Sequence, residues 1–174
     1  MNAKRIFIYG VTGSGKSTLA QQVAERTGLP YVAVDDLTWE PGWKIVPFDH
    51  QNVIFAEICD RQEWVMDSAY GHWLEIPLAR VELIVAMDYP RWVSFGRLFK
   101  RTFKRLIDQQ SVCNGNYESL KVIFSRESIL LWHFRSFRRK RERIKAWEAE
   151  GRAMITFRHP REAEQWLNSL HKSS

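Results

Sequence analysis

The chain has 174 residues, 45% of them hydrophobic, which is enough for one substantial core and short for two, so we expect a single domain spanning residues 1–174. Its apolar runs are too short to cross a membrane, and its two cysteines, Cys59 and Cys113, lack C-x-x-C spacing and follow no secretory signal. We therefore expect a cytoplasmic protein and exclude membrane-spanning, disulfide-rich and cysteine-metal classes. The net charge of +6 is uneven: residues 91–145 carry 15 Lys or Arg against 4 Asp or Glu, and the rest is net acidic.

The first predicted strand leads directly into a glycine-rich loop. Residues 6–9 form a short apolar run that is typical of a buried parallel strand, and Gly10 ends it. Residues 10–17 read GVTGSGKS and match G-x-x-x-x-G-K-[ST] at every fixed position, and a helical pattern follows. Such a loop turns its backbone N–H groups toward nucleotide phosphates, aided by the dipole of the following helix. The predicted nucleotide-binding residues of this P-loop are Gly10, Thr12, Gly13, Ser14, Gly15, Lys16, Ser17 and Thr18.

Two side chains of the loop have specific expected roles. Lys16 is placed to reach the β- and γ-phosphates as a mobile point charge. The hydroxyl of Ser17 is placed to coordinate Mg²⁺. We therefore expect ATP and Mg²⁺ as cofactors.

The second predicted strand, residues 31–34, ends at two carboxylates, Asp35 and Asp36. Ligands of open α/β sheets bind at the carboxyl ends of the strands, so we expect Asp35 to lie across the crevice from the P-loop. There it would accept a proton from an acceptor hydroxyl or hold Mg²⁺ through water; the alternative for both residues is a helix N-cap. An aromatic, turn-rich loop containing Pro41-Gly42 follows, and apolar spacing predicts a helix over residues 48–60.

Two further strands also end in aspartate. Residues 64–66 precede Asp67, and residues 83–87 precede Asp88. A carboxylate on a strand adjacent to the first is what a P-loop Mg²⁺ site needs. We favour Asp67 for this role and keep Asp88 as the alternative, because sequence order alone does not settle which strand flanks the first.

From Trp92 onward the pattern is helical and basic. Arg97, Arg101 and Arg105 recur every four residues, which places three guanidinium groups on one helix face. Arginines that close over a nucleotide stabilise charge on the transferring phosphoryl group. We therefore predict a helical lid at about residues 92–145 and assign catalytic roles to Arg97 and Arg101.

The remainder of the basic segment has a second interpretation. Residues 109–117 predict a turn, residues 118–137 a helix with a broad apolar surface, and residues 138–141 form an all-basic run. Such a run is most often a solvated helix face. The charge of residues 91–145 also fits a nucleic-acid footprint, which leaves DNA binding as an alternative to the lid.

The last predicted strand, residues 153–157, is followed by Arg158-His159-Pro160-Arg161 and an amphipathic helix. Five short strands thus alternate with helices along the chain. This alternation predicts an α/β fold with a parallel sheet and right-handed crossovers.

Taken together, these motifs resemble the adenylate-kinase-like P-loop family known as DNA topology modulation proteins. The resemblance spans almost the whole chain and is carried by the P-loop, Asp35 with Leu37 and Trp39, Pro41-Gly42-Trp43, residues 64–67, residues 87–92, the Arg97 to Arg105 repeat, residues 116–119 and residues 158–161. It implies a three-layer P-loop NTPase fold with a five-stranded sheet of order 2-3-1-4-5, a helical lid, and ATP with Mg²⁺. It also implies a magnesium-linked role for Asp67, a lid position for Arg97 and a place near the adenine for Arg158.

One departure from the family pattern concerns the acceptor. After the third strand the family commonly reads Asp-Gly-Asn-Tyr, whereas this chain has Asp67-Ser68-Ala69-Tyr70, and the next arginine is Arg80. An AMP acceptor is therefore not indicated. The leading hypothesis is an ATP-dependent phosphotransferase acting on an unidentified small molecule, with nucleotide-regulated DNA binding as the alternative.

Overall fold

The computed structural model describes residues 2–68, 72–108, 111–112, 116–117 and 129–170. For residues 105–106, 111–112, 116–117 and 129–132 it describes the backbone alone. The side chain of Arg105 and most of the helix predicted over residues 118–137 therefore lie outside the described part of the chain.

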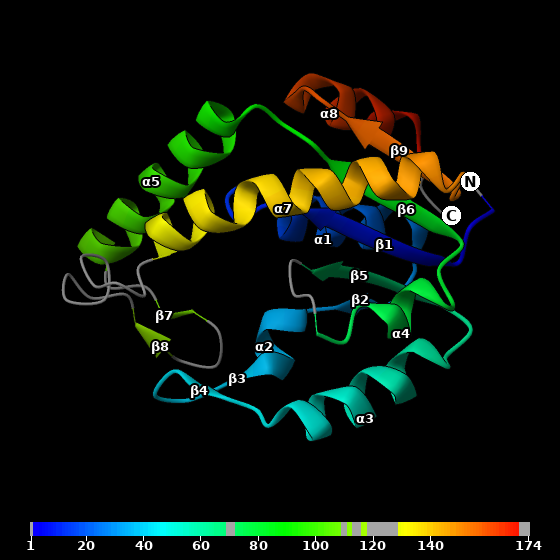
Figure 1. Ribbon diagram of the computed structural model, residues 1–174, viewed down its shortest axis with the longest axis horizontal. Coiled ribbons are helices and arrows are strands. Elements are labelled where there is room, and N and C mark those ends of the chain that lie inside the picture. Colours follow the sequence, from blue (N-terminus) through cyan, green and yellow to red (C-terminus); the bar gives the residue numbers. More distant parts are fainter. Residues whose placement is uncertain (1, 69–71, 109–110, 113–115, 118–128, 171–174) are drawn as a thin grey trace.

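A five-stranded parallel sheet forms the centre of the molecule (Figure 1). Its strands, in spatial order, are β2 (Tyr31–Val32), β5 (Trp64–Ser68), β1 (Arg5–Gly10), β6 (Leu83–Met87) and β9 (Met154–Phe157). All pairings in this sheet are parallel. The sheet is thus built from the five segments that the apolar runs of the sequence predict as strands.

The order β2-β5-β1-β6-β9 differs in its labels from the predicted 2-3-1-4-5. The difference arises because an unpredicted antiparallel hairpin, β3 (Trp39–Glu40) and β4 (Lys44–Ile45), precedes the third strand of the sheet along the chain. A second hairpin, β7 (Ser111–Val112) and β8 (Asn116–Tyr117), precedes the last strand. Neither hairpin joins the central sheet, so the positions of the five sheet strands are unaffected by them.

Helices cover both faces of the sheet and form the outer layers. Their bounds are α1 (Lys16–Thr27), α2 (Val34–Thr38), α3 (Phe48–Cys59), α4 (Glu75–Leu78), α5 (Arg91–Asp108), α7 (Ile129–Ala149) and α8 (Pro160–Ser169). The last of these begins with a capping box, in which the His159 ring accepts from the Arg161 N–H and the Glu162 carboxylate accepts from the His159 N–H. None of the described helices is long and apolar enough to cross a bilayer.

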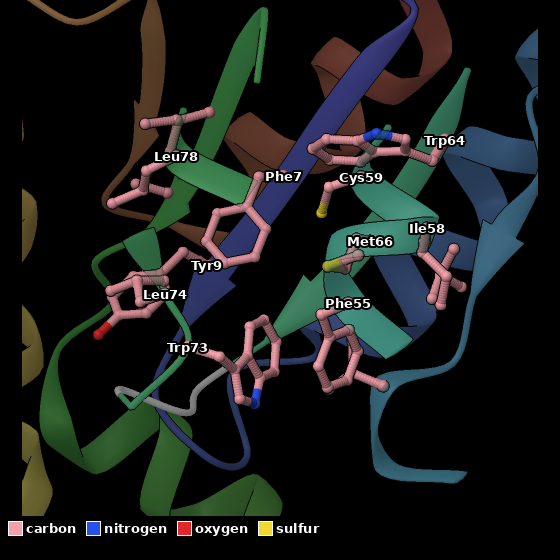
Figure 2. Close-up of a cluster of buried hydrophobic side chains, with 14 of the residues drawn as sticks. Phe7, Tyr9, Phe55, Ile58, Cys59, Trp64, Met66, Trp73, Leu74 and Leu78 are labelled. Carbon is pink, nitrogen blue, oxygen red and sulfur yellow. The ribbon is translucent and has the colours of Figure 1, made fainter. Parts of the chain in front are cut away.

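The alternation of side chains along β1 creates two cores. Ile6 and Ile8 face a cluster formed with α1 and α8, while Phe7 and Tyr9 face a cluster formed with α3, α4 and α7. All four side chains are fully buried. Figure 2 shows the second cluster, in which the rings of Phe55 and Trp73 stack with centroids 3.9 Å apart.

The second strand is shorter than predicted. It ends at Val32, and the short helix α2 begins at Val34, so Asp35 and Asp36 lie in the first turn of a helix rather than directly after a strand. Carboxylates are favourable there because they face the positive end of the helix dipole. The N-cap itself is Ala33, so neither aspartate is the cap residue.

Two long helices, α5 and α7, pack against each other beside the sheet (Figure 1). The α7 residues that are buried recur with helical spacing, at His133, Ser136, Phe137, Lys140, Ile144 and Trp147. The amino end of this face meets α5, where the Ser94 hydroxyl and the His133 ring are hydrogen-bonded at 2.9 Å. The carboxyl end meets the sheet, where the Trp147 and Tyr9 rings lie 4.8 Å apart.

Candidate functional site

The P-loop connects the carboxyl end of β1 to the start of α1. Gly13 and Gly15 have φ values of 82° and 94°, in the left-handed region that glycine adopts without strain. Gly15 is the N-cap of α1 and supplies no side-chain cap to the first turn of that helix. The N–H groups at a helix start without a side-chain cap attract anions, so the geometry of this loop is compatible with a bound phosphate.

Helix α5 closes over the loop at Gly13. A Cβ atom added to Gly13 would overlap the carbonyl oxygen of Ser94 and lie 2.8 Å from the Cβ of Leu98. Arg97, on the same stretch of α5, donates from Nη1 to the Ser14 carbonyl oxygen at 3.0 Å and lies 5.7 Å from the centre of the Tyr89 ring. The predicted lid arginine therefore contacts the P-loop directly.

Asp67 lies beside the P-loop serine. The Ser17 hydroxyl donates to Oδ2 of Asp67 at 2.7 Å, and the Tyr31 hydroxyl donates to Oδ1 at 2.9 Å. Asp67 is 4% exposed, and this burial raises the pKa of its carboxyl, against the opposing effects of Lys16 and of the hydrogen bond from Ser17. Burial and the nearby Asp67 also raise the pKa of the Tyr31 phenol, which keeps that hydroxyl a donor.

The alternative aspartate, Asp88, has a different partner. It follows β6, is buried, and its Oδ1 lies 2.7 Å from Nε of Arg141 while its Oδ2 accepts from Nη2 at 3.2 Å. This paired geometry ties α7 to the end of β6. Of the two strand-end carboxylates, Asp67 is the one in contact with Ser17.

Oxygen ligands are available for a magnesium ion at the Ser17 and Asp67 side chains, which is the donor chemistry that Mg²⁺ prefers. Among the described residues there is no group of three or more His, Cys, Asp or Glu that could hold a metal. A magnesium ion at this position would accordingly complete its coordination with phosphate oxygens and water.

The acceptor-side candidate, Asp35, is half-buried in α2. Its charge contributes to the raised pKa of Asp67, so the two carboxylates are near enough to each other to interact. The hairpin that follows α2 carries Trp39 and Trp43, whose rings meet edge to face at 5.8 Å, and Trp43 is partly exposed. Aromatic rings with one open side next to a carboxylate are suited to holding a small polar ligand.

The other predicted site residues are more dispersed. Arg101 lies one turn beyond Arg97 on α5 and is partly exposed, Thr12 is half-buried and Thr18 is exposed at the start of α1. Arg158 is exposed and follows β9. Because β9 runs parallel to β6, Arg158 leaves the sheet at the same edge as the P-loop.

The structure adds a residue that the sequence interpretation did not single out. Lys140 belongs to the basic run at residues 138–141, yet it is 2% exposed, and its Nζ has no hydrogen-bond partner among the described residues. The signal was present in the helical period, because position 140 is in phase with Phe137, Ile144 and Trp147. The positive charge of residues 138–141 favoured an exposed helix face, so the burial of Lys140 was not predicted.

Several other basic residues of the 91–145 segment are also engaged within the fold. Arg91 lies 4.7 Å from the centre of the Phe137 ring, Arg141 pairs with Asp88, and Arg143 donates to the Tyr9 hydroxyl at 3.3 Å. DNA binding by this segment stays a prediction from the charge pattern, because none of these contacts tests it.

Comparison with known proteins supports the fold. No protein-family model and no curated protein matches the sequence. Among solved structures, a sugar kinase from Janibacter sp. HTCC2649 matches with 19% identity and a TM-score of 0.52, over 95% of this chain and 90% of that one. A gluconokinase from Sinorhizobium meliloti 1021 matches with 19% identity and a TM-score of 0.53, over 96% and 93%. These matches show that the chain shares the α/β fold of these two structures, and they do not bear on the resemblance to DNA topology modulation proteins.

Proposed function

We propose that this protein is an ATP- and Mg²⁺-dependent phosphotransferase that acts on a hydroxyl group of a small molecule. The observation that carries the proposal is the 2.7 Å hydrogen bond between Ser17 and Asp67, beside a P-loop whose helix start is uncapped. A phosphate site and an oxygen-ligand pair for Mg²⁺ are thereby adjacent. The location at the carboxyl ends of parallel strands is where α/β enzymes bind their ligands.

The donor side is assigned to the loop and its neighbours. The backbone N–H groups of residues 10–18 and the ammonium of Lys16 hold the phosphates of ATP. Ser17 and Asp67 hold Mg²⁺, which when bound neutralises charge on the phosphate oxygens. Arg158, at the same sheet edge, lies toward the adenine.

The acceptor side is assigned to Asp35. The acceptor oxygen forms a bond to the γ-phosphorus while the bond to the β–γ bridging oxygen breaks, ADP leaves with that electron pair, and the hydroxyl proton passes to the Asp35 carboxylate. Arg97 and Arg101 stabilise charge on the phosphoryl group. The hydrogen bond from Arg97 to the Ser14 carbonyl oxygen supports this role, because it holds the guanidinium against the P-loop.

We infer the class of acceptor from the matching solved structures and from the surroundings of Asp35. The two solved structures that match are described as a sugar kinase and a gluconokinase, and the partly exposed Trp43 lies on the hairpin that follows Asp35. Aromatic rings stack on the apolar faces of polyhydroxy compounds as readily as on bases. Sugars and sugar acids therefore lead the candidate acceptors, with nucleosides second.

The test is ADP formation from ATP and Mg²⁺ across a panel of sugars, sugar acids, nucleosides and nucleotides. We expect turnover that depends on one acceptor class, and we expect Lys16→Ala to lose that turnover by a factor of 10² or more, because the transferring phosphoryl loses its cation. Lys145→Met, an exposed substitution on α7, is the matched control.

Two results would contradict the proposal. One is an unchanged affinity of the Lys16→Ala protein for ATP with Mg²⁺, measured by calorimetry. The other is ADP formation at the same rate with every acceptor and with none, which would indicate a simple ATPase.

A further inference from the structure

Helix α7 is held in place on either side of Lys140. On the amino-terminal side, His133 bonds Ser94, the residue whose carbonyl oxygen lies against Gly13 of the P-loop. On the carboxyl-terminal side, Arg143 bonds the hydroxyl of Tyr9, which comes just before Gly10. Lys140 lies between these two contacts on the buried face of α7, which is thus anchored to the residues on either side of the P-loop.

The charges that act on the Lys140 amine come from three elements of the fold. They are Lys16 of the P-loop, Arg139 and Arg143 of α7, and Asp35 of α2. Lys16 is on the donor side and Asp35 is on the acceptor side of the proposed reaction. Lys140 is therefore near enough to both sides for Lys16 and Asp35 to act on its amine.

The Lys140 amine has no partner that balances a positive charge. Its Nζ is buried without a hydrogen-bond partner among the described residues. An unpaired buried ammonium costs several kcal/mol, so such a group tends to give up its proton. Burial and the three nearby cations lower the pKa of Lys140 to about 7, against the opposing effect of Asp35.

We propose that Lys140 is a second phosphate-binding lysine, whose buried amine takes up a proton when the γ-phosphate of ATP enters the site. The phosphate supplies the negative charge and the acceptor oxygens that the buried amine lacks. The proton comes from the buffer acid, whose bond to hydrogen breaks as the new N–H bond of the ammonium forms, and no heavy-atom bond changes. This inference rests on the proposed function, because the anion that Lys140 receives is the phosphoryl group to be transferred.

Calorimetry in pairs of buffers that differ in ionisation enthalpy measures the proton uptake directly. The probes are Mg²⁺ with the ATP analogue that has an imido β–γ bridge, and Mg²⁺ with ADP, both at pH 8. We expect the wild-type protein to take up close to one proton more than Lys140→Met on binding the triphosphate analogue. With ADP, which has no γ-phosphate, the difference in proton uptake between the wild type and Lys140→Met should fall close to zero.

Two further variants separate a phosphate contact from a structural role. Lys140→Arg keeps a permanent charge, so it should bind the analogue within about threefold of wild type and take up no extra proton. Lys140→Met should bind at least tenfold more weakly. Lys145→Met, exposed on the same helix, should match the wild type in both readouts.

The outcomes distinguish this inference from the function on which it rests. Equal proton uptake by wild type and Lys140→Met, or equal affinity for the analogue, overturns the role of Lys140 and leaves the kinase proposal intact. Failure of the wild-type protein to bind either nucleotide overturns both.

Discussion

The buried amine of Lys140 lowers the stability of the free protein by an amount that depends on pH. Its pKa is lowered from 10.5 to about 7 on folding, so between these values the unfolded chain binds more protons than the folded one. The free energy of unfolding must therefore rise with pH across this window. The cost of the buried charge is fully present below pH 7 and is lost as the pH approaches 10.5.

The prediction is that Lys140→Met is more stable than the wild type by about 1–4 kcal/mol at pH 6, because a buried unpaired charge is replaced by an apolar side chain of similar length. The difference should shrink steadily up to pH 9. Urea unfolding at pH 6, 7, 8 and 9 measures it, and the raised pKa of the buried Cys59 thiol affects both proteins alike. A difference that stayed constant with pH would mean that the amine does not titrate in this range.

The contact between helix α5 and the P-loop depends on the absence of a side chain at Gly13. Gly13→Ala would place a methyl group against Ser94 and Leu98 at a φ of 82°, which L-residues seldom adopt. We expect at least a tenfold loss of affinity for ATP with Mg²⁺ and a destabilisation of at least 1 kcal/mol. Nucleotide titration and urea unfolding measure the two effects.

The matched control is another glycine, on α5 itself. A Cβ at Gly96 would meet nothing within 4 Å. Gly96→Ala should leave nucleotide affinity unchanged and stabilise the helix by about 0.5–1 kcal/mol. If Gly13→Ala behaved like Gly96→Ala, α5 would not be packed on the loop in solution.

The elements that the sequence predicted well are those with a strong local signal. The apolar runs, the glycine spacing of residues 10–17 and the basic periodicity from Arg97 locate the central strands, the P-loop and α5. Asp67, which the sequence analysis favoured over Asp88 for the magnesium-linked role, lies beside Ser17. The motif alone gave no distance between these two side chains. Strong local preference and tertiary structure coincide at these places.

The elements that the sequence missed are short or are determined by distant contacts. Helix α2 has five residues and the strands of the hairpin β3-β4 have two each, too few for a period to be visible. The sequence analysis treated Lys140 as part of a charged run. Its burial depends on the contacts of α7 with α5 and β1, which the sequence does not show. The pairing of Asp88 with Arg141 is likewise a contact across 53 positions of sequence.

For the molecule as a whole, nucleotide binding should raise thermal stability, because ligand that binds only the folded state shifts the unfolding equilibrium. At a concentration of 100 times Kd, ATP analogue with Mg²⁺ should add about 2.7 kcal/mol, or about 5–10 °C in Tm for a domain of this size. Thermal scans with increasing ligand measure the shift. The Lys16→Ala variant should show less than a quarter of this increase in Tm. A full increase in that variant would mean that the nucleotide binds away from the P-loop.

The contact of α5 with the P-loop also has a consequence for the timing of folding. The motif at residues 10–17 is synthesised early, but Arg97 reaches Ser14 across 83 positions of sequence. A growing chain that ended before α5 would contain every residue of the motif and every fixed glycine, and would still lack one wall of the loop. The nascent protein thus completes the surroundings of this loop only after more than half of the chain has been synthesised.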